Sequence, residues 1–195
     1  MSLASVAPAC RASTRSTTAG FWFDDGLGPL PSELTAKLGG PLTQPDLERI
    51  EALSRSQLRT AFAGLRITVT PARDAFWRVQ VSRELRYRGT LASTGESLAL
   101  GPLGGIGEVN FPLVVQKAVE FAPRGASRQT MVDGIGRGIG RVAVHEFFHQ
   151  ILGPGAKHND TDPDSYESGN ADRASQYYGN LHWTIAWPLL QKRLG

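Results

Sequence analysis

The sequence predicts a single domain of the mixed α+β class. The chain has 195 residues, of which 41% are hydrophobic and 20% are charged, so it can bury one sizeable core. Strand-like and helix-like hydrophobic periods follow one another in the order helix, strands, helix, loop, helix. No internal repeat and no interdomain linker interrupts that order after residue 20. These observations favour a mixed sheet that packs against helices.

The amino-terminal region is expected to be less regular than the rest. Residues 1–20 are rich in Ser, Thr and Ala and lack the charged and apolar regions of a signal peptide. We therefore expect a flexible leader, followed by a domain that spans residues 21–195. Phe21-Trp22-Phe23 is expected to anchor the start of this domain in the core, and an inhibitory segment lying over a cleft is the alternative. Pro and Gly punctuate residues 24–45, which predicts a loop.

Hydrophobic periodicity predicts the next elements in turn. A helix is expected over residues 46–63, with Asp46 as its N-cap. Alternating side chains predict strands over residues 66–70 and 76–82. Residues 95–111 are rich in Gly but still apolar, so we expect a bulged or edge strand around a glycine turn. Residues 113–121 fit a strand or a helix equally well.

The last third of the chain combines a glycine-rich segment with the most strongly helical pattern. Glycines occupy alternate positions from 134 to 140, a spacing that differs from the GxGxxG of dinucleotide-binding folds. A helix is expected over residues 141–152, and Gly153-Pro154-Gly155 should end it. A polar, acidic loop over residues 157–170 follows. A final helical region, expected from about residue 172, should be broken or kinked by its proline.

Composition narrows the possible partners and cofactors. The net charge is +3, and the arginines are scattered without the dense basic block of a nucleic-acid platform, so we expect no nucleic-acid partner. No apolar run reaches the roughly 18–20 residues that span a bilayer, so we expect no membrane partner. A single cysteine, Cys10, excludes an internal disulfide and a cysteine-based zinc cluster. A transition metal would need His, Asp and Glu ligands, and a monomer is the default expectation.

The sequence His145-Glu146-Phe147-Phe148-His149 is a complete HExxH motif on the predicted helix. Residues i and i+4 lie one turn apart on the same face of a helix, so both imidazoles can bind one zinc ion. Glu146 points about 100° away from His145 around the helix, where its carboxylate can reach a metal-bound water. We therefore predict His145 and His149 as zinc ligands and Glu146 as the catalytic base.

A zinc site of this kind needs a third protein ligand. His158 is the favoured candidate because three of the four histidines fall within fourteen residues. Glu167 is the main alternative, with Asp172 as a group that could orient a histidine. A calcium site in the acidic loop that begins at Asn159 is conceivable, although that loop lacks the glycine and the distal Glu of an EF-hand. Its acidic members are Asp160, Asp162 and Asp164.

The motif and the residues after it resemble the metzincin clan of zinc metallopeptidases, and matrix-metalloproteinase-like members in particular. In that clan HExxHxxGxxH is followed by a Met-turn beneath the metal. Here Gly153 comes one position late and His158 three positions late, and the Met-turn position falls on Tyr166, with no methionine after Met131. The resemblance implies a compact zincin-like domain, with a mixed twisted sheet, an active-site helix and a C-terminal helix. It also implies that His145, His149 and His158 bind zinc.

The predicted function is therefore that of a zinc-dependent endopeptidase acting on protein or peptide substrates. A peptide is expected to add as a strand to an exposed sheet edge near residues 98–111. Three alternatives remain open: a gluzincin-type peptidase with Glu167 as the third ligand, a metal-binding domain without catalysis, and a basic interaction domain in which the motif is accidental. Localisation is not determined by the sequence, although export is common among such peptidases.

Overall fold

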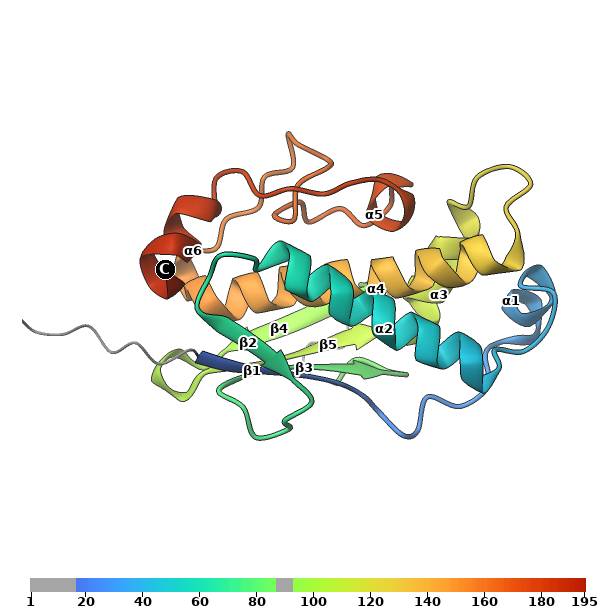
Figure 1. The fold of residues 1–195 in the computed structure, drawn as a ribbon, viewed down its shortest axis with the longest axis horizontal. Helices are drawn as coiled ribbons and strands as arrows, with labels where there is room; N and C mark the ends of the chain where they lie inside the picture. Colours follow the sequence, from blue (N-terminus) through green and yellow to red (C-terminus); the bar gives the residue numbers. More distant parts are fainter. Residues whose placement is uncertain (1–16, 87–92) are drawn as a thin grey trace, which may run out of the picture.

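The computed structural model describes residues 17–86 and 93–195 and shows a mixed α+β fold, as the sequence predicts (Figure 1). Five strands form one sheet in the order β2-β1-β3-β5-β4. The first four of these are parallel to one another, and β4 runs antiparallel to β5 at the edge. The elements in chain order are β1 (Thr17–Phe23), α1 (Ser32–Lys37), α2 (Gln44–Ala61), β2 (Ile67–Thr70), β3 (Trp77–Ser82), β4 (Gly95–Ala99), η1 (Gly101–Leu103), β5 (Gly105–Asn110), α3 (Phe111–Glu120), α4 (Arg128–Leu152), η2 (Gly153–Gly155), α5 (Ser175–Tyr178) and α6 (Trp187–Leu194).

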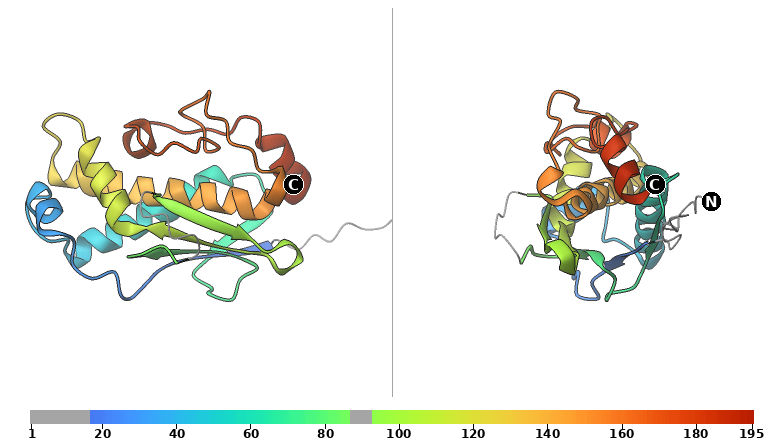
Figure 2. Two further views of the ribbon diagram at one scale, coloured as in Figure 1. Left: turned by 180° about the vertical axis from the view of Figure 1, so that it is seen from behind. Right: turned by 90° about the vertical axis from the view of Figure 1, so that its left-hand side faces the viewer.

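The helices cover one face of the sheet, with α4 at the centre of the molecule (Figures 1 and 2). Helix α2 lies beside α4, and the C-terminal segment after α4 passes over the side of α4 that faces away from the sheet. The core therefore forms between the sheet and α2–α4, and a second contact layer forms between α4 and the C-terminal segment. Among the described residues, no helix is both long enough and apolar enough to cross a membrane.

Strand β1 begins within the predicted leader. The sheet starts at Thr17, whereas the boundary was expected at residue 20; residues 1–16 lie outside the described part of the chain. Phe21 is fully buried, which confirms that this segment anchors the core. Gly20 lies where the connection from β2 to β3 passes β1, and a Cβ there would overlap the carbonyl oxygen of Ala72. A small residue at this position is therefore required by the crossing.

Helix α2 matches the predicted helix, but its N-terminus is built differently. Thr43 is the N-cap, and its side chain accepts a hydrogen bond from the backbone N–H of Asp46. Asp46 is the third helical residue, and its carboxylate accepts from the backbone N–H of Thr43 at 2.8 Å, completing a capping box. The expectation that Asp46 is the N-cap is therefore wrong by three residues.

Helix α4 is twice as long as predicted because it includes the glycine-rich segment. It begins at Arg128, after the N-cap Ser127, and ends at Leu152, where the glycine–proline turn stops it as expected. The alternating glycines form two i, i+4 pairs on two faces of this helix. A Cβ on Gly136 or Gly140 would lie 2.8 or 2.7 Å from side-chain carbons of α2. A Cβ on Gly134 or Gly138 would lie 2.5 or 2.6 Å from the tyrosines of α5. Because these four glycines have no side chains, α2 and α5 can both pack closely against α4.

The remaining strands and helices confirm some of the predicted elements and correct others. Strands β2 and β3 match their predictions, and residues 95–111 form two strands around a 3-10 turn, with β4 as the edge strand. The ambiguous segment 113–121 lies in the helix α3. The final helical region is two short helices, and Pro188 stands in the first turn of α6, where it begins a helix and does not break one.

Candidate metal centre

Helix α4 brings His145 and His149 to the same spot, as the i, i+4 spacing predicts. Their Nε2 atoms are 3.0 Å apart, and both side chains are half-buried. Val144, Phe147 and Phe148 on the same helix are fully buried, so the core fixes the rotation of the helix about its axis. That rotation directs the two imidazoles away from the core and toward a cavity.

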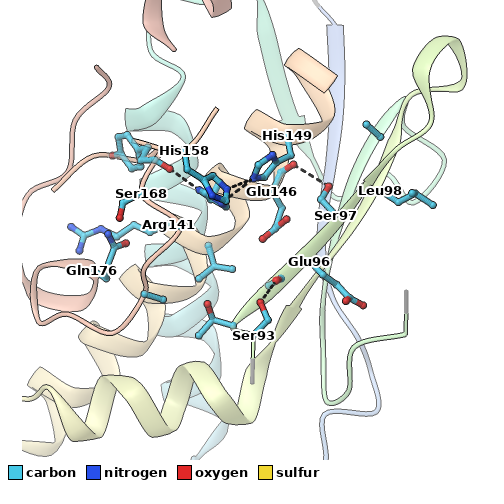
Figure 3. A pocket seen from close by; sticks show the side chains of 18 of the residues that line it. Ser93, Glu96, Ser97, Leu98, Arg141, Glu146, His149, His158, Ser168 and Gln176 are labelled. Carbon is cyan, nitrogen blue, oxygen red and sulfur yellow. Dashed lines mark hydrogen bonds between the residues drawn. The ribbon is translucent and has the colours of Figure 1, made fainter. Parts of the chain in front are cut away.

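The chain then turns back and places His158 against the same two rings. After the η2 turn, the Nε2 of His158 lies 2.9 Å from the Nε2 of His149 (Figure 3). Gly169 supports this position, because a Cβ there would lie 2.7 Å from the Nδ1 of His158. Within the described residues, these histidines are the only group of three or more His, Cys, Asp or Glu whose ligand atoms lie within 4.8 Å of one another.

The geometry of the three nitrogens suits one small cation. Two imidazole nitrogens that each lie 2.0–2.1 Å from a tetrahedral zinc ion are about 3.3 Å apart. The two observed separations, 3.0 and 2.9 Å, are slightly shorter than this value. A cluster of three imidazole nitrogens also matches the donor set that zinc prefers when cysteine is absent. The three histidines therefore fit a metal ion of this size and type.

The protonation state of His145 also suits a metal ligand. Burial is the main cause that lowers the pKa of His145 to about 4, and the hydrogen bond to Tyr166 partly opposes it. The ring is therefore neutral near pH 7, and a neutral imidazole has a lone pair for a metal. Its Nδ1 lies 2.9 Å from the carbonyl oxygen of Tyr166. This contact makes Nδ1 the protonated nitrogen and leaves Nε2 facing its two neighbours.

Glu146 lies on the wall of a cavity of about 520 Å³ that also contains the three histidines (Figure 3). The carboxylate has room because Gly95 of β4 has no side chain: a Cβ there would lie 2.5 Å from the Oε1 of Glu146. The edge strand is tied to the helix at this point, since the hydroxyl of Ser97 donates to the carbonyl oxygen of Glu146 at 3.2 Å. The cavity thus lies between β4, α4 and the C-terminal segment.

The structure does not bring Glu167 to the histidines. Its side chain is fully buried, and both carboxylate oxygens accept hydrogen bonds from the C-terminal segment. Oε1 accepts from the backbone N–H groups of Thr184 and Ala186 at 2.9 and 2.7 Å, and Oε2 accepts from the hydroxyl of Thr184 at 2.6 Å. Asp172 pairs with Lys117 at 2.8 Å and does not orient a histidine. Glu167 is therefore placed as a structural anchor.

Two carboxylates of the acidic loop make contacts within the loop or with the C-terminal segment. Asp160 accepts from the backbone N–H of Gly169 at 2.9 Å. Asp162 accepts from the backbone N–H of Asp164 at 3.1 Å and pairs with His182, the fourth histidine, at 3.0 Å. These contacts hold the loop that carries His158. They give no support to the predicted calcium site, which stays a prediction.

Sequence reasoning missed three features of the site. Gly95 makes room for Glu146, the Tyr166 carbonyl orients His145, and Arg141 lies on the cavity wall one turn before His145. Only Arg141 had a signal in the sequence, because it stands four residues before His145 and so shares a helix face with both histidines of the motif.

No protein-family model, curated protein or solved structure matches this chain. The site must therefore be interpreted from its own geometry.

Proposed function

We propose that this protein is a zinc-dependent metallopeptidase with a zincin-like fold, in which His145, His149 and His158 hold the metal and Glu146 is the catalytic base. The observation that carries the proposal is the convergence of three Nε2 atoms beside a buried carboxylate in one open cavity. The fold supports the proposal by placing the antiparallel edge strand β4 beside the long helix that carries the motif.

The contacts of the site give each side chain a separate role. A zinc ion held by these three histidines would lower the pKa of a bound water to about 7 and would polarise a carbonyl group. The Glu146 carboxylate accepts a proton as the water oxygen attacks the carbonyl carbon of a peptide. It then gives this proton to the amine nitrogen when the carbon–nitrogen bond breaks. The Tyr166 carbonyl holds the ring of His145 in the required tautomer throughout.

The edge strand β4 supports a peptide rather than a compact small molecule as the substrate. Its outer edge has no partner strand within the described sheet, and it forms one wall of the cavity. An extended peptide that adds to β4 would pass in front of Glu146, because Gly95 and Ser97 both touch this part of the helix. The backbone of the substrate would then be held by hydrogen bonds that do not depend on its sequence.

The test is peptide hydrolysis by wild-type protein and by Glu146→Gln, with zinc content measured on both. We expect about one zinc per chain in each, hydrolysis in the wild type that chelation abolishes, and a loss of at least about 10³-fold in Glu146→Gln. Full activity in Glu146→Gln would refute the assigned mechanism. Bound zinc without hydrolysis of any peptide would instead favour a metal-binding domain without catalysis.

A further inference from the structure

Arg141 is a buried cation on the wall of the candidate cleft. It lies one helical turn before His145, so its side chain leaves α4 on the same face as the two histidines of the motif. The residue is only 4% exposed, and it lines the cavity together with Ser168 and Gln176 (Figure 3). A positive charge therefore lies next to the three histidines, within the same cavity.

The charge of Arg141 has no counter-ion in the described part of the chain. Its guanidinium donates to the carbonyl oxygens of Ser175 and Gly179 and to the side-chain oxygen of Gln57, all of which are uncharged. None of the ion pairs between described residues includes Arg141, so no carboxylate there lies within 4.0 Å. A guanidinium has five N–H groups, and these three bonds use three of them.

A buried charge that has hydrogen bonds but no carboxylate within ion-pair distance is unusual, because desolvation of an ion is costly unless an opposite charge compensates it. Desolvation lowers the pKa of Arg141 to about 10, and the nearby Arg137 lowers it further, whereas Tyr166 and Asp164 raise it. The group is still protonated near pH 7. A carboxylate that enters the cavity would find a preformed cation with donor capacity to spare.

The direction of β4 indicates which part of a substrate reaches Arg141. Strand β4 runs alongside α4 in the same direction: Gly95 approaches Val142, and Gly105, the register partner of the last residue of β4, approaches Gln150. Arg141 is therefore at the amino-terminal end of β4. A peptide that pairs antiparallel with β4, the more stable pairing, would point its carboxyl-terminal part toward this end.

We propose that Arg141 forms a carboxylate-binding subsite on the C-terminal side of the bond that is cleaved, so that the preferred substrates are acidic peptides or peptides with a free C-terminus at that position. This inference rests on the proposed function, because it takes the cleft as a peptide-binding site. The ligand chemistry is a carboxylate in both cases, from an Asp or Glu side chain or from the chain end.

The test compares matched peptides that differ only in charge. One series carries Glu, Gln or Lys at each position after the cleaved bond, and a second series carries a free or an amidated C-terminus. In zinc-loaded wild type we expect kcat/KM to be about 10- to 100-fold higher for Glu than for Gln at one position, or for the free over the amidated end. The series that shows the effect identifies the source of the carboxylate.

The variants are Arg141→Met, which keeps the apolar stem without the charge, and Arg141→Lys, which keeps the charge. We expect the Glu-over-Gln ratio to fall to about one in Arg141→Met and to remain above one in Arg141→Lys. Arg137→Met is the matched control, because Arg137 lies one turn earlier on α4, pairs with Asp133 and does not line the cavity. Its ratio should equal that of the wild type, and melting temperature and zinc content show whether each variant is folded.

Binding to Glu146→Gln separates this inference from the proposed function. Peptide affinity measured by calorimetry on that variant, with and without Arg141→Met, does not require turnover. Hydrolysis without any preference between Glu and Gln, or between free and amidated ends, would overturn the subsite and leave the function intact. Arg141-dependent binding of acidic peptides without hydrolysis would leave the subsite intact and overturn the function. An equal preference in wild type and Arg141→Met would also overturn the subsite.

Discussion

The placement of Glu167 and His158 predicts opposite effects when each is replaced. Glu167→Gln should destabilise the fold and leave zinc binding intact, because its carboxylate is bonded to the C-terminal segment and not directed at the histidines. His158→Ala should abolish zinc binding at ordinary concentrations and leave the metal-free fold as stable as before. His158 is exposed, and its ring lies against the rings of His145 and His149.

The size of the Glu167 effect follows from its hydrogen bonds. An amide NH₂ in place of Oε1 would face the backbone N–H groups of Thr184 and Ala186, and an NH₂ in place of Oε2 would face the N–H and hydroxyl of Thr184. In either orientation the remaining hydrogen bonds lose their charged acceptor. Losing one or two charge-assisted hydrogen bonds costs about 2–4 kcal/mol of the unfolding free energy. For a chain of this size that lowers the melting temperature by roughly 5–15 °C.

The size of the His158 effect follows from linkage. Zinc at one hundred times its dissociation constant stabilises the wild type by about 2.7 kcal/mol, which is roughly 5–10 °C. This increment should be absent in His158→Ala, whose metal-free unfolding free energy should stay within about 0.5 kcal/mol of that of the wild type. His182→Ala is the matched control, since His182 is also an exposed histidine but pairs with Asp162.

The assay is a thermal melt with and without zinc, together with metal content per chain, on wild type, His158→Ala, His182→Ala and Glu167→Gln. Zinc lost from Glu167→Gln but retained by His158→Ala would refute the assignment of the third ligand. It would move the protein to the gluzincin-type alternative. No zinc in the wild type after reconstitution would refute the metal centre altogether.

Three further outcomes are expected. Gly95→Ala should reduce peptide hydrolysis at least about tenfold without loss of zinc, because the new Cβ meets the Glu146 carboxylate at 2.5 Å; kcat/KM and metal content measured together test this. Gly138→Ala should lower the unfolding free energy in urea by about 1–2 kcal/mol, since overpacking against the buried Tyr177 outweighs the better helix propensity of Ala. The pKa of His145 falls from 6.5 to about 4 on folding, so the unfolded chain binds more protons between these values. The metal-free protein should therefore lose stability as pH falls from 6.5 to 4, by at most about 3 kcal/mol, and an equal stability in urea at both pH values would contradict this.

The parts of the fold that the sequence predicts are those determined by local patterns. Strands β2 and β3 follow from alternating side chains, and the motif helix follows from its apolar stripe. Strand β1 is not predicted, because Thr17 to Gly20 have the small side chains of a flexible leader. Of these residues, Gly20 is needed where a loop crosses the strand, a requirement that only tertiary structure reveals.

The first half of α4 was missed for a related reason. Glycine is among the weakest helix formers, so alternating glycines argue against a helix on propensity alone. In the structure Gly136 and Gly140 let α2 approach, and Gly134 and Gly138 admit the tyrosines of α5. The packing gained on two faces of the helix outweighs the local preference.

The candidate site shows the same division between local and distant information. The positions of His145, Glu146 and His149 relative to one another are set by helix geometry, so the motif alone predicts them. The choice between His158 and Glu167 is not local, since both follow in one loop and both are chemically suitable. In the structure the Glu167 carboxylate accepts hydrogen bonds from the backbone N–H groups of another segment, whereas His158 lies against His149.

The glycines of β4 and β5 connect the fold to the proposed chemistry. Gly95, Gly105 and Gly107 each lie against side chains of α4, and a Cβ at any of them would come within 2.9 Å of Glu146 or Gln150. Because these positions lack side chains, the backbone of β4 lies directly beside the motif helix. A peptide that extends the sheet from β4 would therefore bring its own backbone, not only its side chains, up to Glu146. Larger residues at Gly95 or Gly107 should weaken hydrolysis of all peptides alike, whereas changes at Arg141 should alter only the choice among them.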